Sequence, residues 1–209
     1  IVDAFHFQLL SEILGQFIGV GVIILVIVFQ QELRKFLMFI GKGKIIKNKG
    51  LLKFNFKMQH ENKLDTSAIS KAFQNMSENR TGAIMVITQI DDLAVFTESG
   101  VNMNAEISVP IIESIFYKNS PLHDGAVIIR DNKIISARCV LPVTNSTEFP
   151  GNLGMRHRAA VGITEESDAV TIIVSEETGN ISYVKDGELF TKRTSIQLEQ
   201  FLNRIFTQS

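Results

Sequence analysis

The sequence of 209 residues is poor in residues that cross-link a chain or bind metals through sulfur. Its single cysteine, Cys139, excludes an intrachain disulfide, and the surrounding run IISARCVL is typical of a small buried side chain. CxxC pairs and the HExxH spacing are absent, so nothing points to a zinc site. The segment GKGK lacks the spacing of a phosphate-binding P-loop, and the sequence shows neither an internal repeat nor a low-complexity stretch.

Acidic residues are scarce in the N-terminal part of the chain. Residues 1–60 carry eight lysines and arginines against three acids, whereas residues 61–209 carry thirteen against nineteen. A chain of this length with 45% hydrophobic residues can bury one core of ordinary domain size. We therefore expect one folded domain and an appendage that faces different surroundings.

Charge is missing altogether from residues 13–31, ILGQFIGVGVIILVIVFQQ. As an α-helix these residues would span roughly 28 Å, close to the thickness of the bilayer hydrocarbon, so we predict a transmembrane helix. A signal peptide is disfavoured because no basic segment precedes the run and no small-residue cleavage site follows it. A buried core helix remains an alternative.

A basic segment follows the apolar run directly. Arg34 and seven lysines precede residue 58, and no acid lies between residues 33 and 60. This asymmetry predicts that the C-terminal side of the span is cytoplasmic and contacts anionic lipid headgroups. Nucleic-acid binding is the other interpretation, but the lipid interpretation is simpler, and we expect no nucleic-acid partner. Because the sequence begins with Ile1, we also expect further spans of the cell membrane upstream.

The rest of the sequence alternates between helical and strand-like patterns. Ile69, Phe73 and Met76 recur on one face of a helix that Asp65 or Thr66 would cap. Strands are expected at GAIMVI and LAVF, followed by a helix in NAEISVPIIESIFYKNS. Pro110 would lie in the first turn of this helix or break it. The remaining expected elements are a hairpin at GAVIIRDNKIISARCVLP, a polar loop at 144–155, a helix at RHRAAVGITEES, a strand at AVTIIVS, a hairpin at ISYVKDGELF and a helix at SIQLEQFLNRIF. This order predicts an α/β fold with a mixed, largely central β-sheet covered by helices.

Three polar clusters stand where a sheet edge would present them: HDGA before a strand, RHRAA at a helix start and SEETG after a strand. Asp124 with Gly125 is ordinary turn chemistry on its own. Arg156 and Arg158 place two cations at the positive end of a helix, which calls for a compensating anion such as phosphate, although a solvated basic turn is the alternative. The carboxylates of SEETG could hold a hard divalent cation or be plain turn residues.

Taken together, an aspartate, a pair of arginines and candidate metal carboxylates are what phosphoryl or nucleotidyl transfer requires. Such a reaction needs a positioned hydroxyl, neutralised phosphate charge and a metal-held leaving pyrophosphate. The residues therefore favour this class of chemistry.

Longer segments carry a resemblance to a known family. ESGVNMNAEISVPIIESIFYKNSPLHDGAVII, RHRAAVGITEESDA and IIVSEETGNIS resemble the diadenylate cyclase domain, whose signatures are Asp-Gly-Ala and Arg-His-Arg. IVFQQELRKFL resembles the junction between the last membrane helix and this domain in the membrane-bound CdaA type. The resemblance covers about residues 13–190. We accordingly assign residues 1–40 to a transmembrane helix with its juxtamembrane segment, 41–62 to a basic linker and 63–209 to the catalytic domain.

The resemblance implies condensation of two ATP into cyclic di-AMP with release of two pyrophosphates, dependent on Mg²⁺ or Mn²⁺. Asp124 would position or activate the ribose 3′-hydroxyl, while a second set would hold the triphosphate: Arg156, His157 and Arg158. The other implied roles are close approach of the nucleotide at Gly125 and Ala126, a metal environment at His123 and Glu177 with Glu176, and an adenine pocket lined by Leu141 and Ser175.

One position departs from the family pattern. The residue before Arg-His-Arg is commonly threonine, and here it is Met155, so a hydroxyl contact to the nucleotide is lost or replaced and base recognition or affinity is expected to change. Met155 and Glu176 are also assigned to nucleotide binding.

In-line attack by each 3′-hydroxyl on the other nucleotide predicts a homodimer with two ATP-loaded chains face to face. The resemblance adds two expected regulators, a membrane-bound protein and a cell-wall enzyme. Two other classes stay open: a membrane-tethered nucleotide sensor without turnover, and an interaction module whose acidic domain docks a cytoplasmic partner. The intact Asp124 and Arg-His-Arg favour the enzyme over both.

Overall fold

The structure is a computed structural model that describes residues 64–146, 149–151 and 153–206, with positions 20, 21, 24, 25, 27–29 and 33. Contacts divide the chain into two units, residues 1–58 and 59–209, and the fold described below is that of the second unit. Among the described residues, no helix has the length and apolar character needed to cross a membrane. Most of the predicted span at 13–31 and all of the predicted linker at 41–62 lie outside the described residues.

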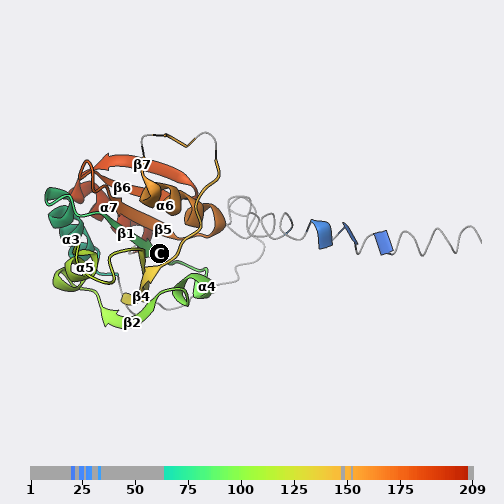
Figure 1. Ribbon diagram of the computed structural model, residues 1–209, viewed down its shortest axis with the longest axis horizontal. Coiled ribbons are helices and arrows are strands. Elements are labelled where there is room, and N and C mark those ends of the chain that lie inside the picture. Colours follow the sequence, from blue (N-terminus) through green and yellow to red (C-terminus); the bar gives the residue numbers. More distant parts are fainter. Residues whose placement is uncertain are drawn as a thin grey trace, which may run out of the picture. The chain divides into compact units, whose positions relative to one another are not determined.

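Within the described residues, seven strands form one mixed sheet in the order β2-β4-β3-β1-β5-β6-β7 (Figure 1). In this sheet β1 and β3 run parallel, and the other neighbouring pairs are antiparallel. The predicted mixed α/β fold is thereby confirmed. The strands are β1 (Ala83–Ile87), β2 (Val101–Glu106), β3 (Ala126–Arg130), β4 (Lys133–Cys139), β5 (Val170–Val174), β6 (Ile181–Lys185) and β7 (Glu188–Arg193).

Helices cover both faces of the sheet. Alternate side chains of β1 enter different cores, because successive residues of a strand point to opposite faces: Met85 joins one buried cluster and Val86 the other. The first cluster is covered by α3, α5 and α7, and the second by α6 (Figure 1). The helices are α3 (Thr66–Glu78), α4 (Ala94–Thr97), α5 (Val109–Phe116), α6 (Met155–Glu166) and α7 (Ser195–Phe206).

Local signals place several of these elements. The Asp65 carboxylate caps α3 by accepting a hydrogen bond from the Ala68 amide at 2.9 Å. Pro110 lies in the first turn of α5, where the missing N–H has no helical partner to lose. Asp131 and Asn132 both have positive φ, 52° and 59°, which suits the two-residue turn that joins β3 to β4. The predicted cap, proline position and hairpin are therefore confirmed.

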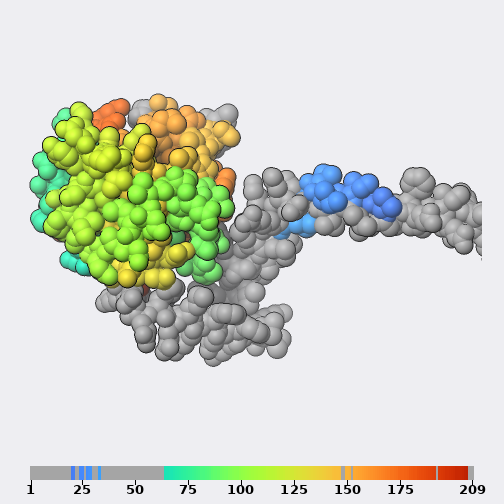
Figure 2. Space-filling view, turned by 60° about the horizontal axis from the view of Figure 1, so that its bottom comes forward, coloured from blue at the N-terminus to red at the C-terminus, as the bar shows by residue number. Residues whose placement is uncertain are grey.

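Two sequence predictions are wrong at the β2 edge. Of residues 93–96, predicted as a strand, Leu93 is the N-cap of the short helix α4 and the other three belong to the helix. Leu93 and Phe96 pack against the core at helical spacing, while Val95 is 78% exposed. The helix predicted from residue 104 begins only at Val109, and residues 101–106 form the unpredicted edge strand β2. This strand was missed because none of its side chains is fully buried and it has no apolar run. In Figure 2 green and yellow segments, which include α4, β2 and β4, make up most of the visible face of this unit.

Candidate functional site

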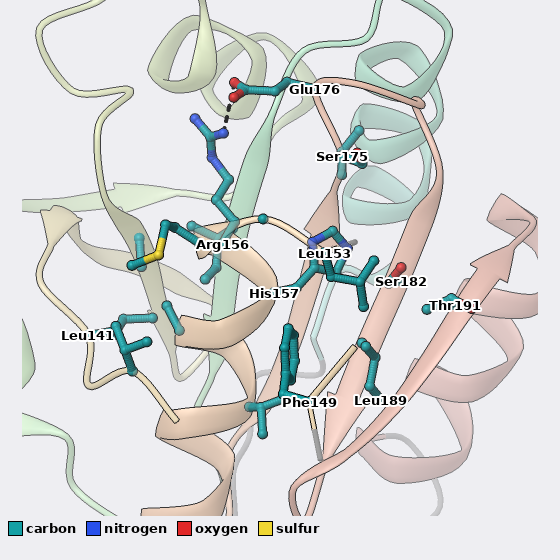
Figure 3. Close-up of a pocket in the computed structure, with 18 of the residues that line it drawn as sticks. Leu141, Phe149, Leu153, Arg156, His157, Ser175, Glu176, Ser182, Leu189 and Thr191 are labelled. Atoms are coloured by element: carbon teal, nitrogen blue, oxygen red, sulfur yellow. Dashed lines mark ion pairs between the residues drawn. The ribbon is translucent and has the colours of Figure 1, made fainter. Parts of the chain in front are cut away.

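A pocket of about 1340 Å³ lies where three segments meet. They are the turn before β3, the start of α6 and the residues after β5, and each lines the pocket with residues predicted for the site. Figure 3 shows Arg156 and His157 at the start of α6 and Ser175 and Glu176 after β5. All three polar clusters of the sequence therefore contribute to one cavity. The predicted residues in its wall are Asp124, Gly125, Ala126, Leu141, Met155, Arg156, His157, Ser175, Glu176 and Glu177.

The Asp-Gly turn serves both structure and pocket. Gly125 has φ +134°, which side chains rarely adopt, and a Cβ there would lie 2.7 Å from the carbonyl carbon of Arg138. Ala126 begins β3 and is fully buried, so the turn is attached to a rigid strand, whereas Asp124 is exposed at the pocket wall. The turn interpretation and the site interpretation of this segment are thus compatible, because the turn presents the carboxylate.

Arg156 has a carboxylate partner at the start of α6. Its Nη1 lies 2.8 Å from Oε2 of Glu176, the residue two positions after β5 (Figure 3). The Arg156 side chain is 27% exposed and that of Glu176 is 61% exposed, so solvent and ligands reach the pair. Gly154 caps α6 without a side-chain hydrogen bond. In the structure the carboxylate of Glu176 compensates the charge of Arg156, and the phosphate predicted for this helix start stays a prediction.

His157, the next residue of α6, is buried, with 4% of its surface exposed. Burial lowers its pKa below the ordinary histidine value, the positive charge of Arg156 lowers it further, and Glu177 opposes the shift. The imidazole is therefore neutral at pH 7. A neutral ring can donate one hydrogen bond and accept another without adding charge to the pocket.

The lowered pKa of His157 makes the stability of the folded chain depend on pH. Since the unfolded chain has the higher histidine pKa, it binds more protons as the pH falls through about 6.5, and the stability present above that pH is lost below it. We expect the melting temperature of the unmodified chain to fall more steeply from pH 7 to pH 5 than that of His157→Gln. Thermal unfolding followed by circular dichroism at each pH measures this; parallel curves for the two proteins would contradict the assignment.

Two predicted residues are not among those that line the pocket. Arg158 is two residues beyond Arg156, about 200° further around the helix, and its guanidinium lies 5.3 Å from the ring centroid of Phe149. Phe149 itself lines the pocket, so Arg158 contacts a residue of the pocket wall without lining the pocket itself. The role of Arg158 in binding the triphosphate stays a prediction.

His123 lies just outside the pocket wall, next to Asp124. Its Nδ1 is 2.6 Å from the carbonyl oxygen of Ser120, and because a carbonyl only accepts, Nδ1 carries the proton. In the neutral tautomer that this contact selects, Nε2 has the lone pair with which a histidine ligates a metal. Within the described residues, no group of three or more histidine, cysteine or acidic side chains is arranged to hold a metal ion.

Sequence reasoning missed the apolar part of the pocket. Phe149, Leu153 and Leu189 line it beside Ser182 and Thr191 (Figure 3). These residues come from a loop and from two strands, and no local motif joins them. Cys139 was predicted only as a buried residue, which is confirmed, yet it also lines the pocket, and burial raises the pKa of its thiol.

The mixed sheet brings an Asp-Gly turn, an arginine at a helix start and carboxylates to one pocket, an arrangement that suits a nucleotide-binding domain. Residues 70–189 match the family described as "DisA bacterial checkpoint controller nucleotide-binding", or DAC. The chain belongs to this family, the diadenylate cyclases, and is an enzyme of that family.

Named relatives and solved structures agree with this membership. "Cyclic di-AMP synthase CdaA" of Bacillus subtilis is 38% identical over 200 residues, which cover 96% of this chain and 71% of the relative. A "Diadenylate cyclase" of Listeria monocytogenes is 38% identical over 198 residues, covering 95% and 71%. The crystal structure of a double mutant of DacA from Staphylococcus aureus matches with a TM-score of 0.66 and 43% identity, covering 66% of this chain and 93% of that one. A "hypothetical membrane spanning protein" from Bacillus cereus matches with a TM-score of 0.60 and 43% identity, covering 63% and 65%.

Proposed function

We propose that this chain condenses two molecules of ATP into cyclic di-AMP and releases two pyrophosphates. The observation that carries the proposal is the convergence of Asp124 and Arg156, 32 residues apart in the sequence, on one pocket wall with Glu176. A carboxylate for a hydroxyl and a guanidinium for a phosphate are the two halves of a nucleotidyl-transfer site. The names of the relatives at 38% identity support the same reaction.

Asp124 would act on the nucleophile. Its carboxylate would accept a hydrogen bond from the ribose 3′-hydroxyl and take the proton as that oxygen attacks the α-phosphorus of the second ATP. The bond from O3′ to the α-phosphorus forms, the bond from that phosphorus to the bridging oxygen breaks, and pyrophosphate leaves. A second, equivalent attack closes the ring. Gly125 and Ala126, without long side chains, would let the nucleotide approach the backbone.

Arg156 would act on the phosphates. Its guanidinium can donate paired hydrogen bonds to phosphoryl oxygens and stabilise the charge that develops there. In the structure Glu176 forms an ion pair with the same group at 2.8 Å, so a bound triphosphate would replace one anion by another. Neutral His157 would add a hydrogen bond from the floor of the site, and Arg158 is proposed to assist through its contact with Phe149.

The donors near the pocket fit a divalent metal that arrives with the triphosphate. Mg²⁺ in nucleotide sites commonly uses one or two protein ligands together with phosphate oxygens and water. Glu177 lines the pocket, and the contact of His123 Nδ1 with the Ser120 carbonyl leaves Nε2 as the ligating nitrogen of the neutral ring, so these two residues would hold Mg²⁺ or Mn²⁺. Such an ion, when bound, acts as a Lewis acid that draws charge from the phosphoryl oxygens.

Leu141, Ser175 and Met155 are proposed to contact the adenine. All three line the pocket, and Met155 is 66% exposed at the first position of α6. A thioether at this position supplies apolar contact with a base but no strong hydrogen-bond donor. Replacing Met155 by threonine would restore the hydroxyl that the family pattern commonly has there.

The active form is proposed to be a homodimer in which two ATP-loaded chains face one another, because one ribose must reach the phosphate of the other nucleotide. The N-terminal part is proposed to tether the enzyme to the cell membrane with the catalytic domain in the cytoplasm, where a membrane protein and a cell-wall enzyme would regulate it. A dimeric mechanism predicts that activity per chain rises with protein concentration, and a rate unaffected by dilution would count against it.

The test is direct. The purified 209-residue chain is incubated with ATP and Mn²⁺ at high protein concentration, and cyclic di-AMP and pyrophosphate are quantified by chromatography and a coupled phosphate assay. Two pyrophosphates per cyclic di-AMP are expected, with no product when the metal is chelated. Saturable ATP binding without product would replace the cyclase by a nucleotide sensor.

A further inference from the structure

Gly82 is buried immediately before β1, although the fold places no conformational demand for glycine there. Its φ lies outside the left-handed range in which side chains are strained. The reason for a glycine must therefore lie in the space around it. We propose that Gly82 is a positioning residue that leaves room for the Arg156 guanidinium at the phosphate end of the pocket. This inference rests on the proposed function, in which Arg156 binds phosphoryl oxygens.

The contacts around Gly82 identify what fills that space. A Cβ built on Gly82 would lie 2.7 Å from Nη1 of Arg156 and 2.9 Å from its Cζ. Its next neighbour would be Cβ of Glu176, at 3.0 Å. These are the two partners of the ion pair, and Nη1 is the nitrogen that contacts Glu176. The space that a side chain at residue 82 would occupy is thus filled by the ion pair of Arg156 and Glu176.

The backbone under the guanidinium cannot yield easily. β1 is paired with β3 on one side and with β5 on the other, where Ala83 lies opposite Val174, and its five residues are all buried. The Arg156 side chain is long and 27% exposed, so a methyl group at residue 82 would displace the guanidinium rather than the strand. A shift of about 1 Å in a positioning group can lower a rate by up to about a hundredfold.

The direct test is Gly82→Ala in the full chain, with inorganic tripolyphosphate as the probe for the phosphate end of the pocket. We expect its dissociation constant, measured by calorimetry, to rise about tenfold or more, with little change in the binding of adenosine. Gly151→Ala is the matched control, because a Cβ on Gly151 meets no atom within 4 Å and the residue does not line the pocket. Equal tripolyphosphate binding by Gly82→Ala and the unmodified chain would overturn the proposal.

A double-mutant cycle with Arg156→Ala separates positioning from general structural damage. If Gly82 acts through Arg156, adding Gly82→Ala to Arg156→Ala has no further effect on tripolyphosphate binding. Should Gly82→Ala alone fail to fold, the double variant is expected to fold, because Arg156→Ala removes the two atoms nearest to the new methyl group, Nη1 and Cζ of Arg156. Additive losses in the folded variants, or a double variant that also fails to fold, would assign Gly82 to the fold alone and overturn the proposal.

The same measurements distinguish this inference from the proposed function. Binding of tripolyphosphate is measured without turnover, so a chain that makes no cyclic di-AMP can still show the loss in Gly82→Ala. In that case the cyclase proposal fails and the positioning role stands. If the chain makes cyclic di-AMP but Gly82→Ala binds tripolyphosphate as well as the unmodified chain does, the cyclase proposal stands and the positioning role of Gly82 fails.

Discussion

Asp124→Asn is expected to lower the rate of cyclic di-AMP formation by about 10²- to 10⁴-fold while leaving ATP binding within a few fold, because a positioned base contributes on that order. Asparagine keeps the shape of the side chain but cannot take the proton from the 3′-hydroxyl. The fold should survive, since the aspartate is exposed and the turn conformation depends on Gly125, which is unchanged. Product formation under saturating ATP and calorimetric ATP binding measure the two effects separately.

Asp92→Asn is the matched control for this variant. Asp92 is another aspartate of the same domain, 67% exposed in its side chain, and it forms a surface ion pair with Arg130 at 2.7 Å. It does not line the pocket, so its loss should leave turnover unchanged. An Asp124→Asn enzyme as active as Asp92→Asn would remove Asp124 from the reaction.

Arg156→Lys is expected to lower kcat/KM by about 10²- to 10³-fold, the range found when one donor to a developing charge is removed. Lysine keeps the positive charge but replaces the planar fork by a single ammonium group, so paired hydrogen bonds to phosphoryl oxygens are lost. It also loses the contact between Nη1 and Glu176 that aligns the guanidinium. Steady-state kinetics across ATP concentrations, with tripolyphosphate binding measured in parallel, tests this expectation.

Arg130→Lys provides the corresponding control, because Arg130 also pairs with a carboxylate but does so away from the pocket wall. An exposed pair of this kind contributes little to stability, so kinetics and melting temperature should be close to those of the unmodified chain. If Arg156→Lys behaved in the same way, the phosphate-binding role of the guanidinium would be wrong. The paired comparison separates loss of a fork in the pocket from loss of any arginine.

Much of the fold could be predicted from local sequence because the spacing of apolar residues in a strongly periodic segment indicates which of its side chains are buried. Ile69, Phe73 and Met76 repeat at helical spacing, and all three are buried in α3. The run GAIMVI forms the fully buried β1, as continuous apolar segments in central strands do. Asp131 and Asn132 tolerate positive φ, so the β3–β4 hairpin could be predicted from its turn. In each case one short segment contains the whole signal.

Prediction failed where the environment of a segment, and not its own pattern, decides its structure. The strand β2 pairs with β4 at the sheet edge although its side chains are exposed or half-buried. Leu93 and Phe96 reveal a helix only once the core against which they pack is known. Arg156 and Arg158 are near neighbours in the sequence, yet helix geometry sends the first into the pocket and leaves the second against Phe149.

Residue order alone is enough to identify the chemical groups of this enzyme: an aspartate in a turn with glycine, a cationic helix start and acidic residues after a strand. Each of these depends on residues adjacent in the chain, so local pattern is sufficient to find it. The folded chain was needed to show which groups share a cavity, that Glu176 pairs with Arg156, and that Gly82 lies next to the pair. These contacts join β1, α6 and the end of β5 through the pairing of distant strands, and that pairing is a property of the folded sheet.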